Sequence, residues 1–369
     1  MVKMDSEFLR KAKVYVAVIF LQIGNSGFAI VAKGALDKGT SHFTLSVYRN
    51  AIAALIFLPF ALVFERKIRP RMTLGVFAKI LLLSFLDPIM GQNLFYVGMN
   101  ITTATFAAAL CNLMPSLAFV MAWILRVEKV KVKDRSSQAK IVGTLITLAG
   151  AMIMTFISGR DLGLPWTHAD DRHQSSAAAG GRQQQQLIKG ALIIFTGNFG
   201  YALFFILQAI TLQSYPAGLS LTALICTMGA VIGTALTFMV ERGNTAIWAL
   251  GWDSKLLAYA YGGIMCSGIS YYISGVIMKT KGPVFVTAFN PLSMVIVAAL
   301  SSFVFAEQMN VGKVTGATVI VIGLYLVIWG KIKDEKAIEE LQTNPSPSID
   351  DDENDNKKIT DPPTASHAV

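Results

Sequence analysis

The residues of this sequence that could do chemistry are mostly polar side chains inside long apolar stretches. Two deep ones are charged, Arg49 and Asp87, and one further amide, Asn50, follows Arg49 directly. Polar groups in hydrocarbon are costly unless they are partnered, so we expect them to face a bundle interior or a wet cavity. Each could hydrogen-bond between helices, worth about 0.6 kcal/mol on average, or contact a ligand. The candidate cavity residues are Gln22, Asn25, Arg49, Gln92, Asn93, Asn112, Asn198, Gln208 and Asn290.

Three prolines lie close to these amides. Pro88 precedes Gln92, Pro115 follows Asn112, and Pro291 follows Asn290 directly. A proline inside a helix removes a backbone hydrogen bond and kinks or breaks the helix. The break is either a packing kink or a binding device, in which a helix N-terminus receives a carboxylate and freed carbonyls take an ammonium group. Asp87 is in addition a candidate for proton coupling, because burial favours the neutral form of a carboxyl group.

Other chemistry finds little support. The sequence has no glycine-rich phosphate loop before Lys-Ser/Thr, and no nucleophile can be paired with a base. His168, Asp170, Asp171 and His173 match no standard metal-site spacing. A phosphorylated substrate would need several cationic clamps, and one deep Arg is few. We therefore expect no enzyme activity, no cofactor and no metal site.

The composition indicates a membrane protein. Of 369 residues, 53% are hydrophobic and 15% are charged, and the mean hydropathy is +0.53. A soluble domain carries about 25% charged residues, and apolar runs of about 20 residues suit helices that cross a bilayer. Twenty-nine basic and 13 acidic side chains precede Asp334, whereas three basic and ten acidic ones follow from there. Because the basic excess flanks apolar runs, it indicates membrane orientation and no nucleic-acid partner.

We predict an all-α integral membrane protein with ten transmembrane helices. Lys and Arg number 19 on one side of these spans and 9 on the other. The positive-inside rule then places both termini in the cytoplasm. The spans cover approximately residues 14–36, 43–64, 76–98, 103–126, 138–158, 188–211, 218–240, 256–278, 284–306 and 312–330.

The halves of the chain are similar to each other. The run Gly24-Asn25-Ser26-Gly27 corresponds to Gly197-Asn198-Phe199-Gly200, and Lys140 corresponds to Lys313 at the same offset. Because five spans is an odd number, the second half must enter the bilayer inverted. Inverted repeats allow a carrier to open alternately to either side of a midplane site, so the repeat favours transport over a receptor or scaffold.

The domain boundaries follow from this repeat and from composition. We expect two five-helix repeats, at 14–158 and 190–333, after a cytoplasmic N-terminus at 1–13. Residues 159–189 are rich in Gly, Ala, Gln and Ser and predict a disordered, non-cytoplasmic linker. Residues 334–369 predict a disordered, acidic cytoplasmic tail.

Several motifs resemble those of a known plant family. The most telling are Tyr48-Arg49-Asn50, Asn112-Leu113-Met114-Pro115, Gly282-Pro283-Val284-Phe285 and Asn290-Pro291-Leu292. The sequence is similar over about residues 12–333 to nodulin-like, Walls-Are-Thin-related proteins, the UMAMIT transporters of the drug/metabolite transporter superfamily, with two EamA-type repeats. Before Pro88 the family more often carries Glu, whereas this chain has Asp87. The resemblance implies facilitators of amino acids, often acting in export, although one member class moves auxin.

We therefore expect a secondary carrier of amino acids, a bidirectional facilitator or exporter that works by alternating access. Its expected partners are a small-molecule substrate and membrane lipid, and the sequence does not determine the oligomeric state. One alternative is a carrier of auxin-like or other organic acids, for which Arg49 would be the carboxylate anchor. Another is a receptor or scaffold that transports nothing. The plasma membrane is the expected location, with the vacuolar membrane as the alternative.

Overall fold

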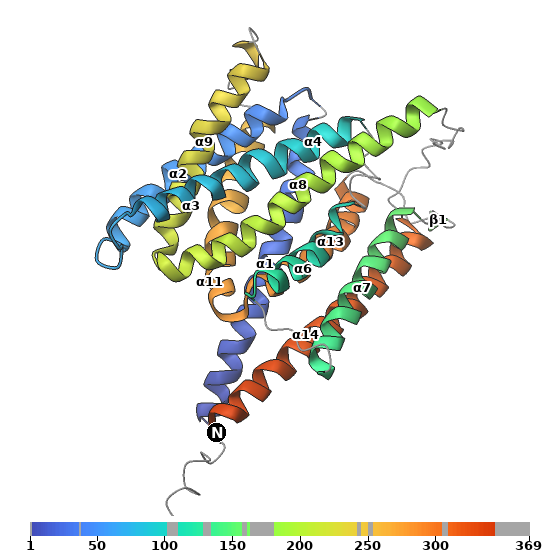
Figure 1. The fold of residues 1–369 in the computed structure, drawn as a ribbon. Coiled ribbons are helices and arrows are strands. Elements are labelled where there is room, and N and C mark those ends of the chain that lie inside the picture. The colour runs from blue at the N-terminus through green and yellow to red at the C-terminus, as the bar shows by residue number, and fades with distance from the viewer. Residues whose placement is uncertain are drawn as a thin grey trace, which may run out of the picture.

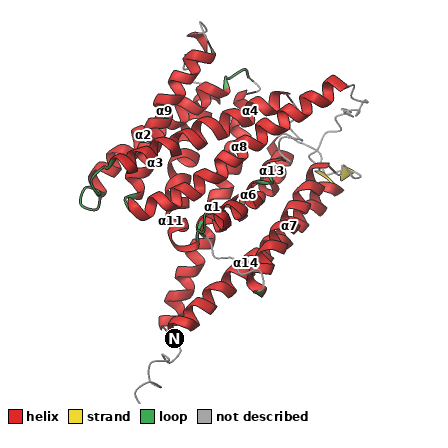
Figure 2. Cartoon of the chain, in the orientation of Figure 1, coloured by secondary structure: helices red, strands yellow, loops and turns green. Residues whose placement is uncertain are grey.

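The computed structural model describes residues 2–36, 38–101, 110–127, 134–156, 161–162, 181–241, 245–249, 254–304 and 309–343. Helices account for nearly all of these residues (Figure 2). The elements of the first half are α1 (Val2–Leu36), α2 (His42–Phe64), α3 (Leu74–Phe85), the π-helix η1 (Leu86–Gly91), α4 (Gln92–Ile101), α6 (Met114–Ile124), α7 (Arg135–Phe156) and the short strand β1 (Asp161–Leu162).

The second half contains a similar series. Its elements are α8 (Gly181–Ser214), α9 (Gly218–Val240), the 3₁₀ turn η2 (Thr245–Trp248), α10 (Ser254–Tyr261), the π-helix η3 (Gly262–Ile269), α11 (Ser270–Lys281), α12 (Pro283–Ala288), α13 (Asn290–Val304), β2 (Met309–Asn310) and α14 (Val311–Thr343). Strands β1 and β2 pair antiparallel, with Asp161 opposite Asn310.

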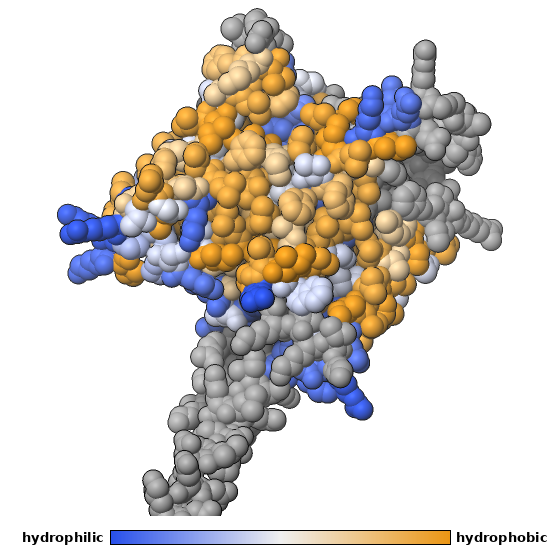
Figure 3. Space-filling view, in the orientation of Figure 1, coloured by the Kyte–Doolittle hydropathy of each residue, from blue (hydrophilic) through white to orange (hydrophobic). Residues whose placement is uncertain are grey.

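The expected integral membrane architecture is confirmed. Eight described helices are long and apolar enough to cross a membrane, and Met114–Ile124 is a shorter apolar helix. The predicted span at 256–278 corresponds to α10, η3 and α11, which follow one another without a break. The middle part, η3, is π-helical. Part of the predicted span at 103–126 lies outside the described residues. Large apolar side chains are exposed on the outer faces, and the side seen in Figure 3 shows them as a broad band with hydrophilic residues at its margins.

Two expectations about disorder need correction at their edges. Helix α8 begins at Gly181, and α14 continues to Thr343, so residues 181–189 and 334–343 are helical. Both stretches are rich in Gln, Glu, Lys, Ala and Leu, which favour helix, and proline first follows at Pro345. The remainder of the tail and most of the linker, including His168, Asp170, Asp171 and His173, lie outside the described residues.

Elements of the two halves interleave. Helix α2 packs on α9 and α7 on α14, while α1 lies against α13 and η3, and α8 lies against α6 and η1 (Figure 1). The last four contacts are related by exchange of the halves, because α1 and α8 occupy equivalent places, as do α6 and α13, and η1 and η3. Each half therefore supplies part of every wall in the centre of the bundle.

Glycines make the α7–α14 contact close. A Cβ atom on Gly323 would lie 2.3 Å from the Thr147 hydroxyl oxygen and 2.7 Å from the Gly143 carbonyl oxygen. On the other helix, a Cβ atom on Gly143 would lie 2.7 Å from the Gly323 carbonyl oxygen. Small residues let membrane helices approach to backbone contact, where dispersion forces stabilise the pair.

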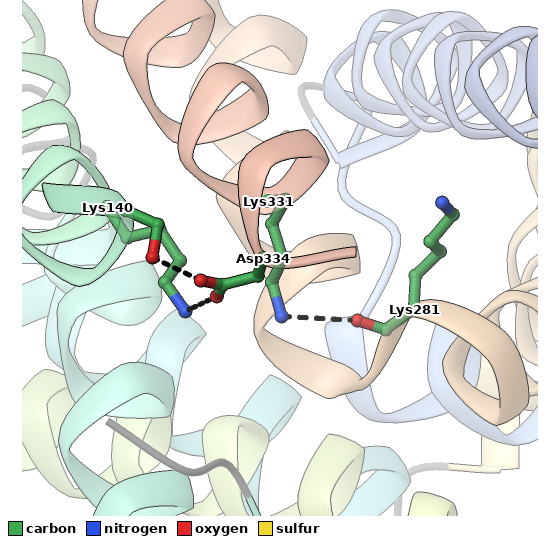
Figure 4. Close-up of polar contacts among 5 residues, drawn as sticks. Lys140, Lys281, Lys331 and Asp334 are labelled. Atoms are coloured by element: carbon green, nitrogen blue, oxygen red, sulfur yellow. Dashed lines mark hydrogen bonds and ion pairs between the residues drawn. The ribbon is translucent and has the colours of Figure 1, made fainter. Parts of the chain in front are cut away.

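An ion pair closes one end of the same helix pair (Figure 4). Lys140 is fully buried, and its Nζ lies 2.6 Å from Asp334 Oδ2, while Ser136 donates a hydrogen bond to the other carboxylate oxygen. Lys331 donates to the carbonyl oxygen of Lys281, 3.3 Å away, at the end of α11. The base of α14 is thus tied both to α7 and to the rest of the bundle.

The close glycine contact predicts that one added methyl group destabilises the protein at the α7–α14 interface but not at an open position. Gly323→Ala should destabilise the protein by about 1–3 kcal/mol, because the new methyl overpacks the interface. Gly34→Ala is the matched control, since nothing lies within 4 Å of its added Cβ atom and Ala favours helix. Thermal unfolding in detergent measures both, and equal melting temperatures for the two variants would contradict the close packing.

Candidate functional site

A cavity of about 260 Å³ opens between the two halves. Its walls come from α1, α2, η1, α4, α8, η3, α11 and α13, so that elements of both repeats meet there. The lining residues are Gln22, Asn25, Phe28, Arg49, Asp87, Gln92, Tyr201, Phe205, Cys266, Ser270, Tyr271, Asn290 and Ser293. Five of the nine candidate cavity residues, Gln22, Asn25, Arg49, Gln92 and Asn290, therefore converge with Asp87 on one space.

Arg49 is a cation in this wall. Its side chain leaves α2, its Nε donates to the Ser267 hydroxyl at 2.8 Å, and its guanidinium carbon lies 5.5 Å from the centre of the Phe28 ring. Among the described residues no hydrogen bond involves its two terminal amino groups. Room for the side chain comes from η3, because a Cβ atom on Gly262 would lie 2.9 Å from Arg49 Cδ.

Asp87 supplies the carboxyl group of the same wall, and it is buried in η1. Its Oδ2 accepts hydrogen bonds from the Tyr271 hydroxyl and from Gln92 Nε2, the latter at 3.4 Å. Its Oδ1 has no partner in the described part of the chain. Pro88 follows within the π-helical segment, and its carbonyl oxygen accepts from the Ser46 hydroxyl at 2.9 Å. The wider π-helical turn and its proline thus hold a carboxyl group whose second oxygen is buried and has no hydrogen-bond partner among the described residues.

Both charged side chains are held by one short segment of the second half. Ser267 and Tyr271 lie four residues apart in the second half, and they bond Arg49 and Asp87 of the first half respectively. No ion pair joins Arg49 to Asp87, both of which belong to the described residues. Ser267 and Tyr271 therefore keep opposite charges apart, and each charge retains unused hydrogen-bonding capacity.

The amides of α1 and α13 form another part of the wall. Gln22 Nε2 lies 3.4 Å from Asn290 Oδ1, and the Ser26 hydroxyl donates to Ser293. Asn25 has no hydrogen bond within the described ranges, although it lines the cavity. These contacts join spans of opposite halves.

Four candidate residues lie outside the lining of this cavity. Asn198 donates to the Leu110 carbonyl oxygen at 2.9 Å and accepts from the Cys111 thiol, in an adjacent cavity. Gln208 donates to the Tyr271 carbonyl oxygen at 3.0 Å. Asn93 is buried, and Asn112 borders a much smaller space beside Pro115 and Pro291. The equivalent Asn25 and Asn198 thus have different surroundings.

The three prolines have different structural roles. Pro88 lies inside η1, whereas Pro115 and Pro291 are the second residues of α6 and α13. A proline is well tolerated at a helix start, where its missing N–H would have no partner. Helix α12 ends at Ala288 and α13 begins at Asn290, so the span is broken there, and Asn290 at the new start faces the cavity.

Sequence reasoning missed the residues that hold the charges. Ser267 and Tyr271 are absent from the candidate residues, and so are the lining aromatic residues Phe28, Tyr201 and Phe205. One signal was present: Leu86–Gly91 and Gly262–Ile269 have corresponding positions in the two repeats, so a polar site at Asp87 pointed to the equivalent segment around Ser267.

Known proteins identify the architecture. Residues 13–156 and 188–329 match the EamA-like transporter family. The chain is 51% identical over 334 residues to the WAT1-related protein At2g37460 of Arabidopsis thaliana, covering 90% of this chain and 87% of that protein. It is 53% identical over 327 residues to the WAT1-related protein At2g39510 of the same plant, covering 89% and 87%. The chain belongs to the EamA-like transporter family, among the plant WAT1-related proteins.

A solved crystal structure supports this fold independently. It superposes with a TM-score of 0.65 at 13% identity and covers 88% of this chain and 99% of its own. The membership makes this chain a multi-pass membrane transporter with a small-molecule substrate. The cavity lined by Arg49 and Asp87 is shared by the two halves of this fold.

The different surroundings of Asn25 and Asn198 predict different mutant effects. Asn198→Ala should lower the free energy of unfolding by about 1–3 kcal/mol, because the Leu110 carbonyl loses its donor, and should reduce all fluxes together. Asn25→Ala should keep the stability and change half-saturation differently for different substrates. Thermal unfolding and uptake at matched protein amounts separate the two effects. Equal destabilisation, with unchanged relative half-saturation in both variants, would contradict this assignment.

Proposed function

We propose that this transporter is a bidirectional facilitator of amino acids that acts largely in export. The observation that carries the proposal is the pair of opposite charges on one cavity wall, Arg49 and Asp87, each with free hydrogen-bonding groups. An α-amino acid has the complementary pair, a carboxylate and an ammonium group on one carbon atom. The cavity of about 260 Å³ limits the substrate to a small molecule.

The two ends of the substrate would bind by different chemistry. A guanidinium group forms a planar, bidentate pair with a carboxylate, which suits the terminal amino groups of Arg49. An ammonium group has only donors, which suits Asp87 Oδ1. An unpaired charge in a low-dielectric interior is costly. The bound zwitterion would compensate both protein charges at once, whereas a simple amine or acid would leave one of them unpaired.

Movement of the two halves would carry the substrate across the membrane. Ser267 and Tyr271 link the second half to the charged residues of the first, and η1 and η3 interrupt regular helix beside the cavity. Inverted repeats that rock about a central site give alternating access, and net transport then follows the substrate gradient. The distribution of Lys and Arg in the loops favours a cytoplasmic location for both termini. We assign the protein to the plasma membrane, with the vacuolar membrane as the alternative.

A second candidate substrate class is aromatic organic acids. Phe28, Tyr201 and Phe205 line the same cavity, and Arg49 alone could anchor a carboxylate. Such a substrate would leave Asp87 Oδ1 without a cationic partner. Flux of an indole acid that exceeds amino-acid flux would favour this class over the zwitterion.

Removing either charge tests the substrate class. Arg49→Ala and Asp87→Asn should each lower kcat/KM for amino acids on the order of 10²-fold, because truncating one partner of a buried pair costs about 2–5 kcal/mol. Arg49→Lys should have an intermediate effect, since it retains charge without the bidentate geometry. Lys79→Ala is the control, because Lys79 contacts Ser214 at an exposed site. Uptake into proteoliposomes measures all four variants, and values for Arg49→Ala and Asp87→Asn within twofold of the control would contradict the proposal.

Proton coupling through Asp87 is tested separately. If the carboxyl group carries a proton during the cycle, a pH gradient should drive wild-type accumulation, whereas the residual flux of Asp87→Asn should not respond to the gradient. Longer uptake times make the slow variant measurable. An unchanged response in Asp87→Asn would exclude the proton role and leave the carrier assignment intact.

The orientation can be measured with single cysteines. Gln185→Cys, at the exposed start of α8, should react with an impermeant maleimide in intact cells, whereas Arg71→Cys should react only after permeabilisation. The native cysteines lie within or beside membrane helices and serve as the background control. The reverse pattern would place the termini outside the cytoplasm.

A further inference from the structure

A second cavity adjoins the one between Arg49 and Asp87. It has a volume of about 200 Å³, several times the roughly 30 Å³ share of one water molecule. Gln92 and Tyr201 line both cavities, so the two spaces meet at these side chains. The second cavity lies between η1, α4, the start of α6 and α8.

The chemistry of the second cavity differs from that of the first. Its wall is built largely by Phe95, Tyr96 and Met114, and none of its described lining residues is charged. The amide of Asn198 already bonds to the Leu110 carbonyl oxygen and the Cys111 thiol, so that its position is fixed by the protein. The site suits an apolar group, which gains free energy on leaving water.

Close backbone packing fixes the shape of this space. A Cβ atom on Gly197 would lie 3.2 Å from the Gly91 carbonyl oxygen and 3.3 Å from Leu94 Cβ, so α8 touches η1 and α4 almost backbone to backbone. The ring of Tyr96 contacts the rings of Phe95 and His42. The walls are thus packed in place and do not depend on a ligand.

Gln92 connects the charged site to this apolar space. It donates to Asp87 Oδ2 and lies 3.2 Å from the Ser46 hydroxyl, so its own amide is engaged and its stem borders both cavities. Gln92 bonds directly to Asp87, so an ammonium group bound at Asp87 would place the neighbouring α-carbon near Gln92. The substituent on that carbon atom then has an apolar space next to it.

We propose that the second cavity is the side-chain compartment of the substrate site, and that it selects amino acids with large apolar or aromatic side chains. This inference rests on the proposed function. The charged cavity recognises what all amino acids share, and the compartment lined by Phe95 and Tyr96 distinguishes among them.

Half-saturation constants for a series of amino acids test the compartment. Proteoliposomes with the full chain are assayed with glycine, alanine, leucine and phenylalanine, and KM should fall on the order of fourfold for each buried methylene. Phe95→Ala should reduce the preference for phenylalanine over glycine by about tenfold or more, because the KM of phenylalanine should rise far more than that of glycine, which has no side chain to place in the compartment. Phe199→Ala is the matched control, because Phe199 lies on α8, beside the lining residue Asn198, but is 42% exposed and does not line the cavity.

A binding measurement on the wild-type protein tests the compartment even if Phe95→Ala does not fold. Phenylalanine should raise the melting temperature of the purified wild-type protein more than glycine does at equal concentration. Equal KM values across the series in the wild type, equal melting shifts, or a uniform rise of all KM values in Phe95→Ala would overturn the compartment while amino-acid transport stands. Absence of flux for every amino acid would instead overturn the proposed function, and the compartment with it.

Discussion

The structure depends on keeping a buried guanidinium group and a buried carboxylate close to each other but not paired. In a low-dielectric interior, opposite charges attract strongly, and a direct pair between Arg49 and Asp87 would consume the groups that a substrate needs. Ser267 and Tyr271 prevent this by occupying one side of each charge. Both come from the other half of the chain, so the state of the binding site is tied to the relative position of the halves. A substrate that binds both charges would act on the same contacts that hold the halves together.

The packing around this site explains why small residues recur through the chain. Gly262 leaves space for the Arg49 side chain, and a Cβ atom on Gly263 would lie 2.8 Å from the Arg49 carbonyl oxygen. Farther out, the glycines of α7 and α14 and the buried Lys140–Asp334 pair fasten those two helices to each other. Helices α7 and α14 lie side by side at the edge of the bundle (Figure 1). The bundle therefore combines close helix packing at its edge with a polar, partly unsatisfied centre.

Much of the architecture could be predicted from the sequence, because the length of apolar runs and the distribution of Lys and Arg are direct consequences of the bilayer. Convergence of Arg49, Asp87 and the amides Gln22, Asn25 and Asn290 followed from the cost of polar groups in hydrocarbon. That rule could not say which amides bond to backbone instead, as Asn198 does. The roles of Ser267 and Tyr271 could not be read from the sequence, because serine is an ordinary small packing residue in membrane helices and the contacts join residues about 200 positions apart. The helical ends of the linker and tail were missed because their polar composition was given more weight than their helix propensity.

The most direct test measures how tightly the purified wild-type protein binds one amino acid and two analogues of it, each of which lacks one of its charged groups. Leucine, its decarboxylated amine and its deaminated acid share the same apolar group. Leucine carries both charges, the amine carries only the ammonium group, and the acid carries only the carboxylate. If Arg49 and Asp87 are held apart to receive a zwitterion, leucine should bind at least about tenfold more tightly than either analogue, since each unpaired charge in the site costs more than about 1.4 kcal/mol. Equal affinity for leucine and its deaminated acid would show that Arg49 acts alone, and would contradict a site built for both charges.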